Sequence, residues 1–358
     1  MSLARYLSKL AALVGSDGKV PASALQPEAQ SVMFKNRIIN GAMMIDQRNA
    51  GASVTPATGG STSSYTLDRW MLNTNISSAA SIQQNAGSVT PPAGFANYLG
   101  VTSLAATSVG ASSYSLLEHR VEGFNFADMA WGTASANPIT ISFWVRSSLT
   151  GTFGGCLQTS ATRFYAYTFT INAANTWEQK TITIAGDTSG TPATGNTTAL
   201  YVRWSIACGS TYRQATGSWS GTAALGATGQ TDVLATNGAT FYITGVQLEK
   251  GSTATSFDYR PYGTELALCQ RYFQNIVAGY NGSAVSGTAN GTMGQFIVPL
   301  RAVPTMTWIS NIAAINFPTT TASFYLSSTV QNFWPYKTAS ATGQDSRYHD
   351  NYTASAEL

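Results

Sequence analysis

Apolar and polar residues alternate along much of this chain, and this period of two constrains the fold more than any other feature. The clearest alternating runs cover residues 139–146 and 200–208, and further β-rich runs cover 164–171, 180–184 and 240–248. Successive side chains of a β-strand point to opposite faces of a sheet, so such alternation indicates strands with one face in a core.

Segments rich in Gly, Ser and Thr, such as residues 186–198 and 209–232, separate these runs. Many strands joined by such turns are typical of an antiparallel β-sandwich or jelly roll. Helix-period segments do not alternate with the strands, which argues against a parallel α/β sheet. We therefore predict a mainly β protein, an antiparallel jelly roll or β-sandwich.

Two segments depart from the strand pattern. Residues 2–14 have the apolar spacing of a coiled-coil seam, at Leu3, Leu7, Leu10 and Val14. A helix this short is marginal alone, so it either packs on its own fold or mediates self-association or docking into a larger particle. Residues 263–275 have helical spacing and follow Pro261, so we predict a second helix there.

These features divide the chain into four parts. Residues 1–35 form the N-terminal helix and connector, which we assign to attachment or oligomerisation. Residues 36–262 form the jelly-roll domain, 263–275 the linking helix, and 276–358 a small C-terminal β domain.

Composition excludes several classes of function. Charged residues make up 10% of the chain, against roughly 25% in average soluble domains. No run of Lys or Arg suits a nucleic-acid backbone, and no apolar run of membrane-spanning length occurs. The N-terminus does not resemble a signal peptide. The three cysteines are widely spaced, so we expect small buried thiols and assembly in a reducing cytoplasm.

The chain offers little for catalysis. Glu118 and Glu122 would share one strand face with His119 on the other, and a Ser-His-Asp triad would need His119 or His349. Both arrangements are expected by chance in a chain of this composition. No sequence motif for nucleotide binding or for a catalytic nucleophile lies between a strand and a helix. We predict no enzyme activity, no catalytic residue, no metal site and no cofactor, and leave a structural calcium ion open.

Binding is the class of function that remains. Recognition of a sugar needs an exposed aromatic face with short polar side chains beside it. One group of aromatic residues occupies alternating strands: Trp144, Tyr165, Tyr167 and Tyr201, with Arg203. A second lies in a loop: Tyr212, Arg213 and Trp219. A third lies in the C-terminal domain: Tyr280, Asn281, Trp308, Trp334 and Tyr336. The candidate glycan-binding residues are those of the third group together with Tyr212 and Trp219. These aromatic residues could instead fill the core or an interface between subunits.

Several strands are apolar on both faces, so loops or neighbouring subunits must cover the second face. We therefore predict a homo-oligomer. The aliphatic seam of residues 2–14 is compatible with three strands.

Several motifs resemble those of phage tail-fibre and virion structural proteins that carry a carbohydrate-binding-module-like jelly roll. The opening motifs are Asn36 to Met43 (NRIINGAM), Asp46 to Arg48 (DQR) and Tyr65 to Trp70 (YTLDRW). Ile141 to Arg146 (ISFWVR) stands at the place of a central core strand. The closing motifs are Ile243 to Gly251 (ITGVQLEKG), Thr255 to Pro261 (TSFDYRP) and Leu266 to Phe273, which contains CQRYF. The resemblance covers roughly residues 1–275. Within these motifs we expect Glu249 to pair with an arginine such as Arg69 or Arg260.

The resemblance implies a virion protein assembled in the host bacterial cytoplasm, a trimer, attachment to other virion proteins through the N-terminus, and a variable tip that meets the host. The first hypothesis is a tail fibre or receptor-binding subunit that contacts host surface glycan. The alternative is a capsid fibre, decoration or connector protein with a mainly structural role, and a glycan-cleaving tailspike is a third possibility. The sequence does not separate the first two.

Overall fold

The computed structural model describes the chain in five stretches. They are residues 35–56, 62–77, 79–320, 322–326 and 330–358. The predicted N-terminal helix lies outside these stretches, together with its candidate oligomerisation residues Leu3, Leu7, Leu10 and Val14.

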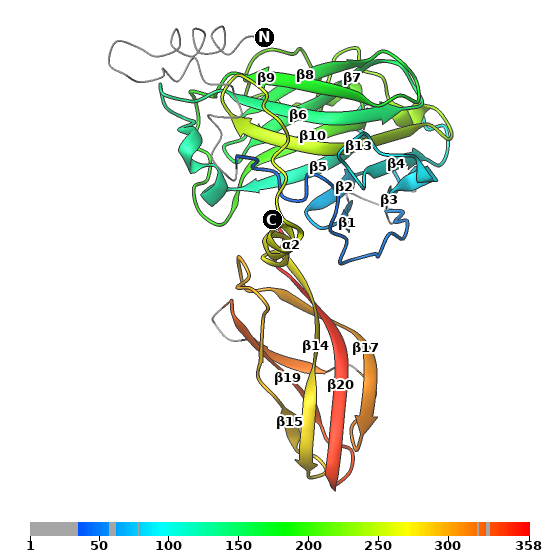
Figure 1. Ribbon diagram of the computed structural model, residues 1–358, viewed down its shortest axis with the longest axis vertical. Coiled ribbons are helices and arrows are strands. Elements are labelled where there is room, and N and C mark those ends of the chain that lie inside the picture. The colour runs from blue at the N-terminus through cyan, green and yellow to red at the C-terminus, as the bar shows by residue number, and fades with distance from the viewer. Residues whose placement is uncertain (1–34, 57–61, 78, 321, 327–329) are drawn as a thin grey trace, which may run out of the picture.

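Two antiparallel sheets packed face to face form the larger part of the molecule (Figure 1). One has the order β1 (Thr62–Leu67), β2 (Trp70–Thr74), β5 (Tyr114–Glu122), β10 (Thr198–Cys208), β7 (Gly151–Thr159) and β8 (Phe164–Ile171). The other has the order β3 (Ala80–Gln84), β4 (Leu99–Ser103), β13 (Thr240–Lys250), β6 (Ile139–Ser147) and β9 (Glu178–Ile184). A short parallel pair, β11 (Arg213–Gln214) and β12 (Gly226–Ala227), lies in a loop. The predicted β-sandwich is confirmed.

The alternating residues of the sequence build the core between the two sheets. On β6, the apolar side chains at positions 139, 141, 143 and 145 are all fully buried. Phe143 packs edge to face against Trp204 of the opposite sheet, with ring centroids 5.5 Å apart. Trp70 lies beside Trp204 at 5.7 Å. Burying such large side chains supplies much of the hydrophobic free energy of folding.

Loops of the same chain cover part of the second, outward faces. Tyr242 of β13 is buried beneath Tyr98, with ring centroids 5.1 Å apart, and Trp177 packs on Tyr98 at 5.5 Å. On the other sheet, Ala224 covers Cys156. The predicted cover of these faces is therefore supplied here by loops. All three cysteines, Cys156, Cys208 and Cys269, are free and buried, as predicted.

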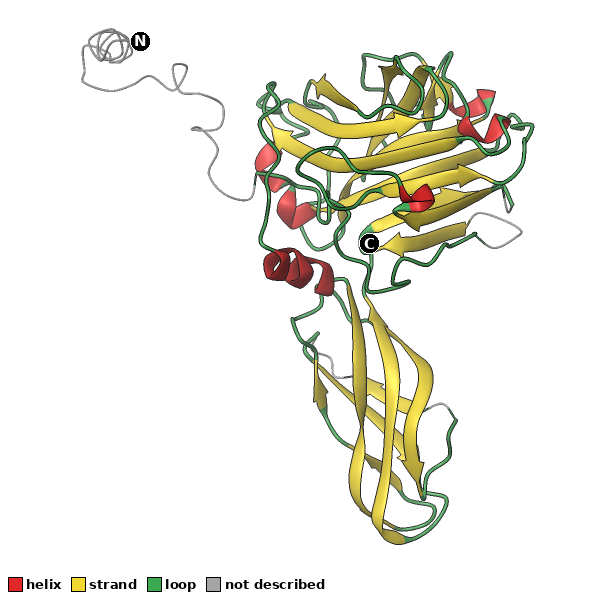
Figure 2. Ribbon diagram, turned by 45° about the vertical axis from the view of Figure 1, so that its right-hand side comes forward, coloured by secondary structure: helices red, strands yellow, loops and turns green. Residues whose placement is uncertain are grey.

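Helix α2 (Tyr262–Gln270) links the sandwich to the C-terminal β domain, which we define as residues 273–358 (Figure 2). The helix ends earlier than predicted because the backbone from Phe273 onward pairs with the last strand of the chain. One sheet of this domain has the order β14 (Phe273–Ala284), β20 (Gly343–Ser355), β17 (Thr305–Ile315). The other contains β15 (Ala289–Gly291), β19 (Asn332–Thr338) and β16 (Gly294–Gln295), and β18 (Ser323–Leu326) pairs with β19.

The two sheets of the C-terminal domain enclose small cores. Phe296 stacks on Phe333 with ring centroids 5.0 Å apart, and Phe317 packs edge to face on Tyr348 at 5.1 Å. Within the described residues, no helix is long and apolar enough to cross a membrane.

Candidate functional site

Among the aromatic side chains of the C-terminal domain whose exposure the structure describes, Trp334 on β19 is the most exposed, at 47%. Strand alternation turns Phe333 into the core and Trp334 outward, and Tyr336 follows on the same outer face. The structure therefore brings together two of the five aromatic and polar residues predicted in this domain.

A glycine lies beneath this aromatic pair. Gly291 of β15 stands opposite Tyr336 in the strand register. A β-carbon at position 291 would collide with the carbonyl oxygen of Pro335 and with Nε1 of Trp334. The indole of Trp334 can therefore lie against the β15 backbone only because position 291 lacks a side chain.

Short polar side chains surround the pair on the same face. Register and alternation place them around the two rings: Ser323, Thr338, Asn332 and Gln295. We call Trp334, Tyr336, Gly291 and these four residues the tip face. It combines two aromatic rings with uncharged hydrogen-bonding groups.

The other predicted residues of this domain lie elsewhere. Tyr280 faces inward, packs on Phe317 and donates a hydrogen bond to the Ser283 carbonyl oxygen (2.6 Å). Asn281 faces the opposite way and contacts His349 at 3.0 Å. These positions follow from strand alternation, which places neighbouring residues on opposite faces.

Trp308 of β17 stands opposite the buried Tyr352 in the register, so its ring faces the other sheet of the domain. Its Nε1 is buried without a hydrogen-bond partner among the described residues. Trp308 therefore does not belong to the tip face.

The predicted loop residues of the sandwich have structural contacts. Tyr212 is half-buried and packs edge to face on Tyr114 at 6.2 Å. Trp219 is half-buried against Trp131 (5.0 Å) and Tyr165 (5.3 Å), and its Nε1 donates a hydrogen bond to a backbone carbonyl. The contacts of Tyr212 and Trp219 are with different partners, so they do not form one aromatic platform.

Sequence reasoning missed a small hollow beside this loop. It is open to solvent, and its empty volume of ≈ 190 Å³ includes solvent outside the mouth. Its lining is Phe126, Ala127, Trp131, Pro192, Ala193 and Thr194. The lining offers few polar groups to orient a ligand.

The predicted strand face of aromatic residues is not one face. Trp144 belongs to the five-stranded sheet, whereas the other members belong to the six-stranded sheet. Tyr165 and Tyr167 pack into the sandwich core. Tyr201 and Arg203 point outward, with the guanidinium 4.6 Å from the ring centroid. The predicted group fails because its members belong to two different sheets, and spacing along the sequence does not show which sheet a strand joins.

The two carboxylates considered for catalysis are held in ion pairs. Glu118 contacts Arg120 (2.6 Å) and Arg203 (2.5 Å), one with each oxygen. Burial alone would raise the pKa of Glu118, but the charges of Arg203 and Arg120 outweigh it and hold the pKa below its ordinary value. Glu122 is buried and contacts Arg271 at 2.7 Å. His119 is buried as well, and burial lowers its pKa well below the ordinary value.

The opening and closing motifs of the sequence build the junction between the two domains. The Asn40 side chain donates hydrogen bonds to the carbonyl oxygens of Ile45 (2.8 Å) and Asp68 (3.0 Å). Glu265 of α2 accepts from the backbone N–H of Asn40 and forms an ion pair with Arg260 at 3.3 Å. These motif residues are therefore tied to one another and to α2.

The predicted pairing of Glu249 with Arg69 or Arg260 is wrong. The Glu249 carboxylate accepts hydrogen bonds from the backbone N–H (2.8 Å) and hydroxyl (2.7 Å) of Thr255 and from the Gln247 amide (3.1 Å). It thereby closes a local loop after β13, and both arginines bind other carboxylates.

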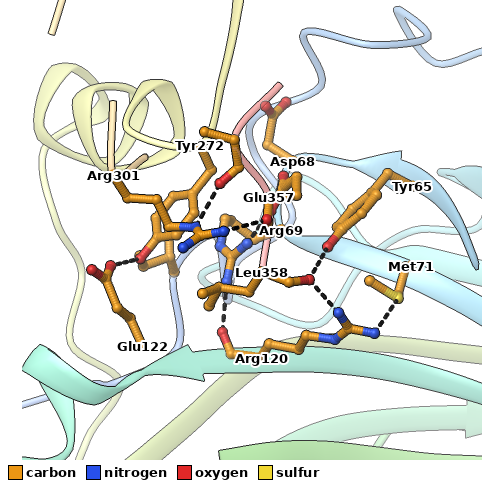
Figure 3. Close-up of polar contacts among 12 residues, drawn as sticks. Tyr65, Asp68, Arg69, Met71, Arg120, Glu122, Tyr272, Arg301, Glu357 and Leu358 are labelled. Carbon is orange, nitrogen blue, oxygen red and sulfur yellow. Dashed lines mark hydrogen bonds and ion pairs between the residues drawn. The ribbon is translucent and has the colours of Figure 1, made fainter. Parts of the chain in front are cut away.

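Arginines of the sandwich converge on residues 357 and 358, as Figure 3 shows. Arg69 is ion-paired with Glu357, and Arg120 donates to the backbone oxygen of Leu358. Arg301 of the C-terminal domain donates to the Glu357 carbonyl oxygen (2.6 Å). No local signal in the sequence indicates this junction, because its ion pairs join residues 288 and 309 positions apart.

No group of three or more His, Cys, Asp or Glu side chains in the described stretches could hold a metal ion.

No family model matches this chain, and no curated protein matches it. Solved structures to which this chain shows weak similarity include the enzymatically active domain of tailspike protein 4 of bacteriophage CBA120 (8% identity, TM-score 0.29). The match covers 51% of this chain but only 19% of the tailspike chain. Another is a putative sugar binding protein from Bacteroides thetaiotaomicron (12% identity, TM-score 0.33), where the match covers 60% of this chain and 99% of that one. A third is a family 11 carbohydrate-binding module from Clostridium thermocellum (11% identity, TM-score 0.27), where the match covers 55% of this chain and 100% of that one. Similarity at this level supports no conclusion about what this chain binds.

Proposed function

We propose that this chain is a bacteriophage virion protein, a tail-fibre or receptor-binding subunit whose C-terminal domain binds a host surface glycan without cleaving it. The observation that carries this proposal is the position of Trp334, exposed on the tip face beside Tyr336 and supported from below by Gly291.

The tip face offers a contact for each of the two kinds of group on a sugar, the apolar C–H face and the polar hydroxyl groups. An indole face packs against the apolar C–H face of a pyranose and removes both from water. Ser323, Thr338 and Asn332 beside the rings can exchange hydrogen bonds with hydroxyl groups. The seven residues that define the tip face carry no charge, which suits neutral sugars.

The experiment is a glycan array probed with the full-length chain, followed by titration calorimetry with the best-bound oligosaccharide. Trp334→Ala should weaken binding about tenfold or more, which corresponds to about 1.4 kcal/mol. Phe124→Ala is the matched control, because Phe124 is 65% exposed but lies on the sandwich. Equal affinities of the two variants would refute a glycan site at Trp334.

The absence of cleavage is part of the proposal. It is supported by the ion pairs of Glu118 and Glu122, which leave neither carboxylate placed to act on a substrate. A polysaccharide solution incubated with the protein should keep its viscosity, and a steady loss of viscosity would contradict this part.

The proposal also includes a homotrimer, with a second copy of the chain against β17. Among the described strands, β17 is an edge strand of its sheet, and it contains no charged residue and no proline. Its exposed apolar residues are Ile309, Ile312 and Ile315. An uncharged, apolar edge strand is a pairing surface that monomeric proteins usually protect.

The place of the chain in the virion is tested by immunogold electron microscopy with antibody against residues 276–358. Gold at the tail supports host recognition. Gold scattered over the head would instead favour a capsid appendage and contradict the tail-fibre assignment.

A further inference from the structure

A buried ion pair lies between the two sheets of the C-terminal domain. Nζ of Lys337, on β19, is 2.7 Å from Oδ2 and 3.1 Å from Oδ1 of Asp350, on β20. The two side chains are 1% and 0% exposed. The ring of Tyr348 lies 5.2 Å from Nζ, and the Tyr352 hydroxyl donates to Oδ2 at 3.1 Å.

A carboxamide completes this cluster. Asn311 of β17 stands opposite Asp350 in the strand register, and its Nδ2 donates to Oδ1 of Asp350 at 2.8 Å. The same oxygen therefore accepts hydrogen bonds from the amine of Lys337 and from the amide nitrogen of Asn311.

A buried ion pair by itself adds little to stability, because removing two charges from water costs about as much free energy as their attraction returns. The arrangement does supply the parts of an acyl transfer. A proton that passes from the Lys337 ammonium to the Asp350 carboxylate, which it contacts at 2.7 Å, leaves a neutral amine as nucleophile. The nitrogen that must leave, Nδ2 of Asn311, is already hydrogen-bonded to the same carboxyl group.

We propose that Lys337 and Asn311 become joined by an isopeptide bond, with Asp350 as the proton carrier. Asp350 takes a proton from the Lys337 ammonium, and Nζ attacks Cγ of Asn311. The tetrahedral intermediate then expels Nδ2, which takes up the proton that Asp350 carries and the second proton of the attacking amine and leaves as an ammonium ion. One C–N bond forms and one breaks, no electron is transferred to or from another molecule, and the Asp350 carboxylate is regenerated.

The bond would link β19 of one sheet to β17 of the other. This is a place where a small domain needs a covalent link, because its hydrophobic cores are small. Residues 276–358 contain no cysteine, so no disulfide can form within them. An isopeptide bond needs no oxidant and can form in a reducing cytoplasm.

The chain contains its own control for this chemistry. Lys180 is 2.6 Å from Glu178, whose Oε2 also accepts from Nδ2 of Asn172 at 2.9 Å. The functional groups match those of the buried cluster, with Glu in place of Asp, but Asn172 is exposed and the side chains of Lys180 and Glu178 are 14% and 15% exposed. Water can reach these side chains and compete for their hydrogen bonds, so we expect no bond there.

The test is the intact mass of the denatured full-length protein, compared with the mass that its sequence requires. The wild-type chain should be lighter by one ammonia, and peptide mapping should find Lys337 linked to Asn311. Lys337→Arg and Asp350→Ala should have their full sequence masses, whereas Lys180→Arg should keep the deficit.

Three results would overturn the proposal. One is a wild-type chain at full sequence mass, a result that does not depend on whether any variant folds. Another is the loss of one water with a link between Lys337 and Asp350. The last is a mass deficit of one ammonia that persists in Lys337→Arg. Cyclisation of Asn311 onto its own backbone would produce such a deficit without Lys337.

Discussion

Arg69 and Glu357 form an ion pair although 288 positions separate them in the chain. Their side chains are 1% and 7% exposed, and the Arg69 guanidinium lies 3.7 Å from the ring centroid of Tyr272. Arg48 contacts the same carboxylate at 2.6 Å. This pair connects the sandwich to the end of the C-terminal domain, so it helps to set the direction in which the tip face points (Figure 3).

Glu357→Gln should destabilise the junction strongly, because it leaves Arg69 buried and Arg48 partly buried without a counter-charge. We expect the free energy of unfolding to fall by about 3 to 5 kcal/mol, measured by denaturant titration. Asp128→Asn is the matched control, because it breaks the Arg37–Asp128 pair at the surface, where the side chains are 23% and 48% exposed. That change should cost less than about 1 kcal/mol. Similar losses in both variants would show that Glu357 is not an anchor.

Stability should depend on pH through Asp68. Burial raises the pKa of Asp68 to about 6, against an ordinary value of 3.8, and the hydrogen bonds from Gln47 only partly oppose this. The folded state therefore binds more protons than the unfolded state between these values, and this contribution to stability decreases as pH rises from about 4 to 6. Denaturant titrations of wild type and Asp68→Asn across this range should show their difference change by about 3 kcal/mol at most. A difference that does not vary with pH would contradict the shift.

Gly291→Ala should weaken glycan binding although it leaves both aromatic rings in the chain. The new β-carbon would collide with Pro335 and Trp334, so the indole must leave the β15 backbone. We expect a loss of affinity of about tenfold in titration calorimetry, close to that of Trp334→Ala. Gly221→Ala is the control, because open space surrounds a β-carbon there. Unchanged binding in Gly291→Ala would show that the support beneath Trp334 does not matter.

Ile312→Lys should disrupt the proposed oligomer. Ile312 is 53% exposed at a bulge in β17, where a charge is harmless in the isolated chain but would be buried against a second copy. Light scattering after gel filtration should find a trimer for the wild type and a monomer for the variant. Val285→Lys, at a loop position 57% exposed, is the control and should remain a trimer. A wild-type monomer would contradict this part of the proposal.

The sequence predicted the sandwich because its signals are local. Alternation at 139–146 shows which face of β6 is buried, and this does not depend on the neighbouring strands. The helix before the C-terminal domain was also predicted, but its end was not, because pairing of Phe273 with Ser355 decides where the helix stops.

The candidate site was predicted only in part. Alternation on β19 was enough to place Trp334 and Tyr336 on one face, but Trp308 required knowledge of which sheet its strand joins. The grouping of Trp144 with Tyr201 failed because they belong to opposite sheets of the sandwich.

By itself, the sequence determined the strand character of the chain and the burial of its three cysteines. Each of these depends on residue type and on spacing within one segment. Tertiary structure alone decided that Arg69 meets Glu357, that Gly291 lies beneath Trp334 and that Lys337, Asp350 and Asn311 share one buried site. The physical reason is that strand order and register set these contacts, and both arise from pairing between segments far apart in the chain.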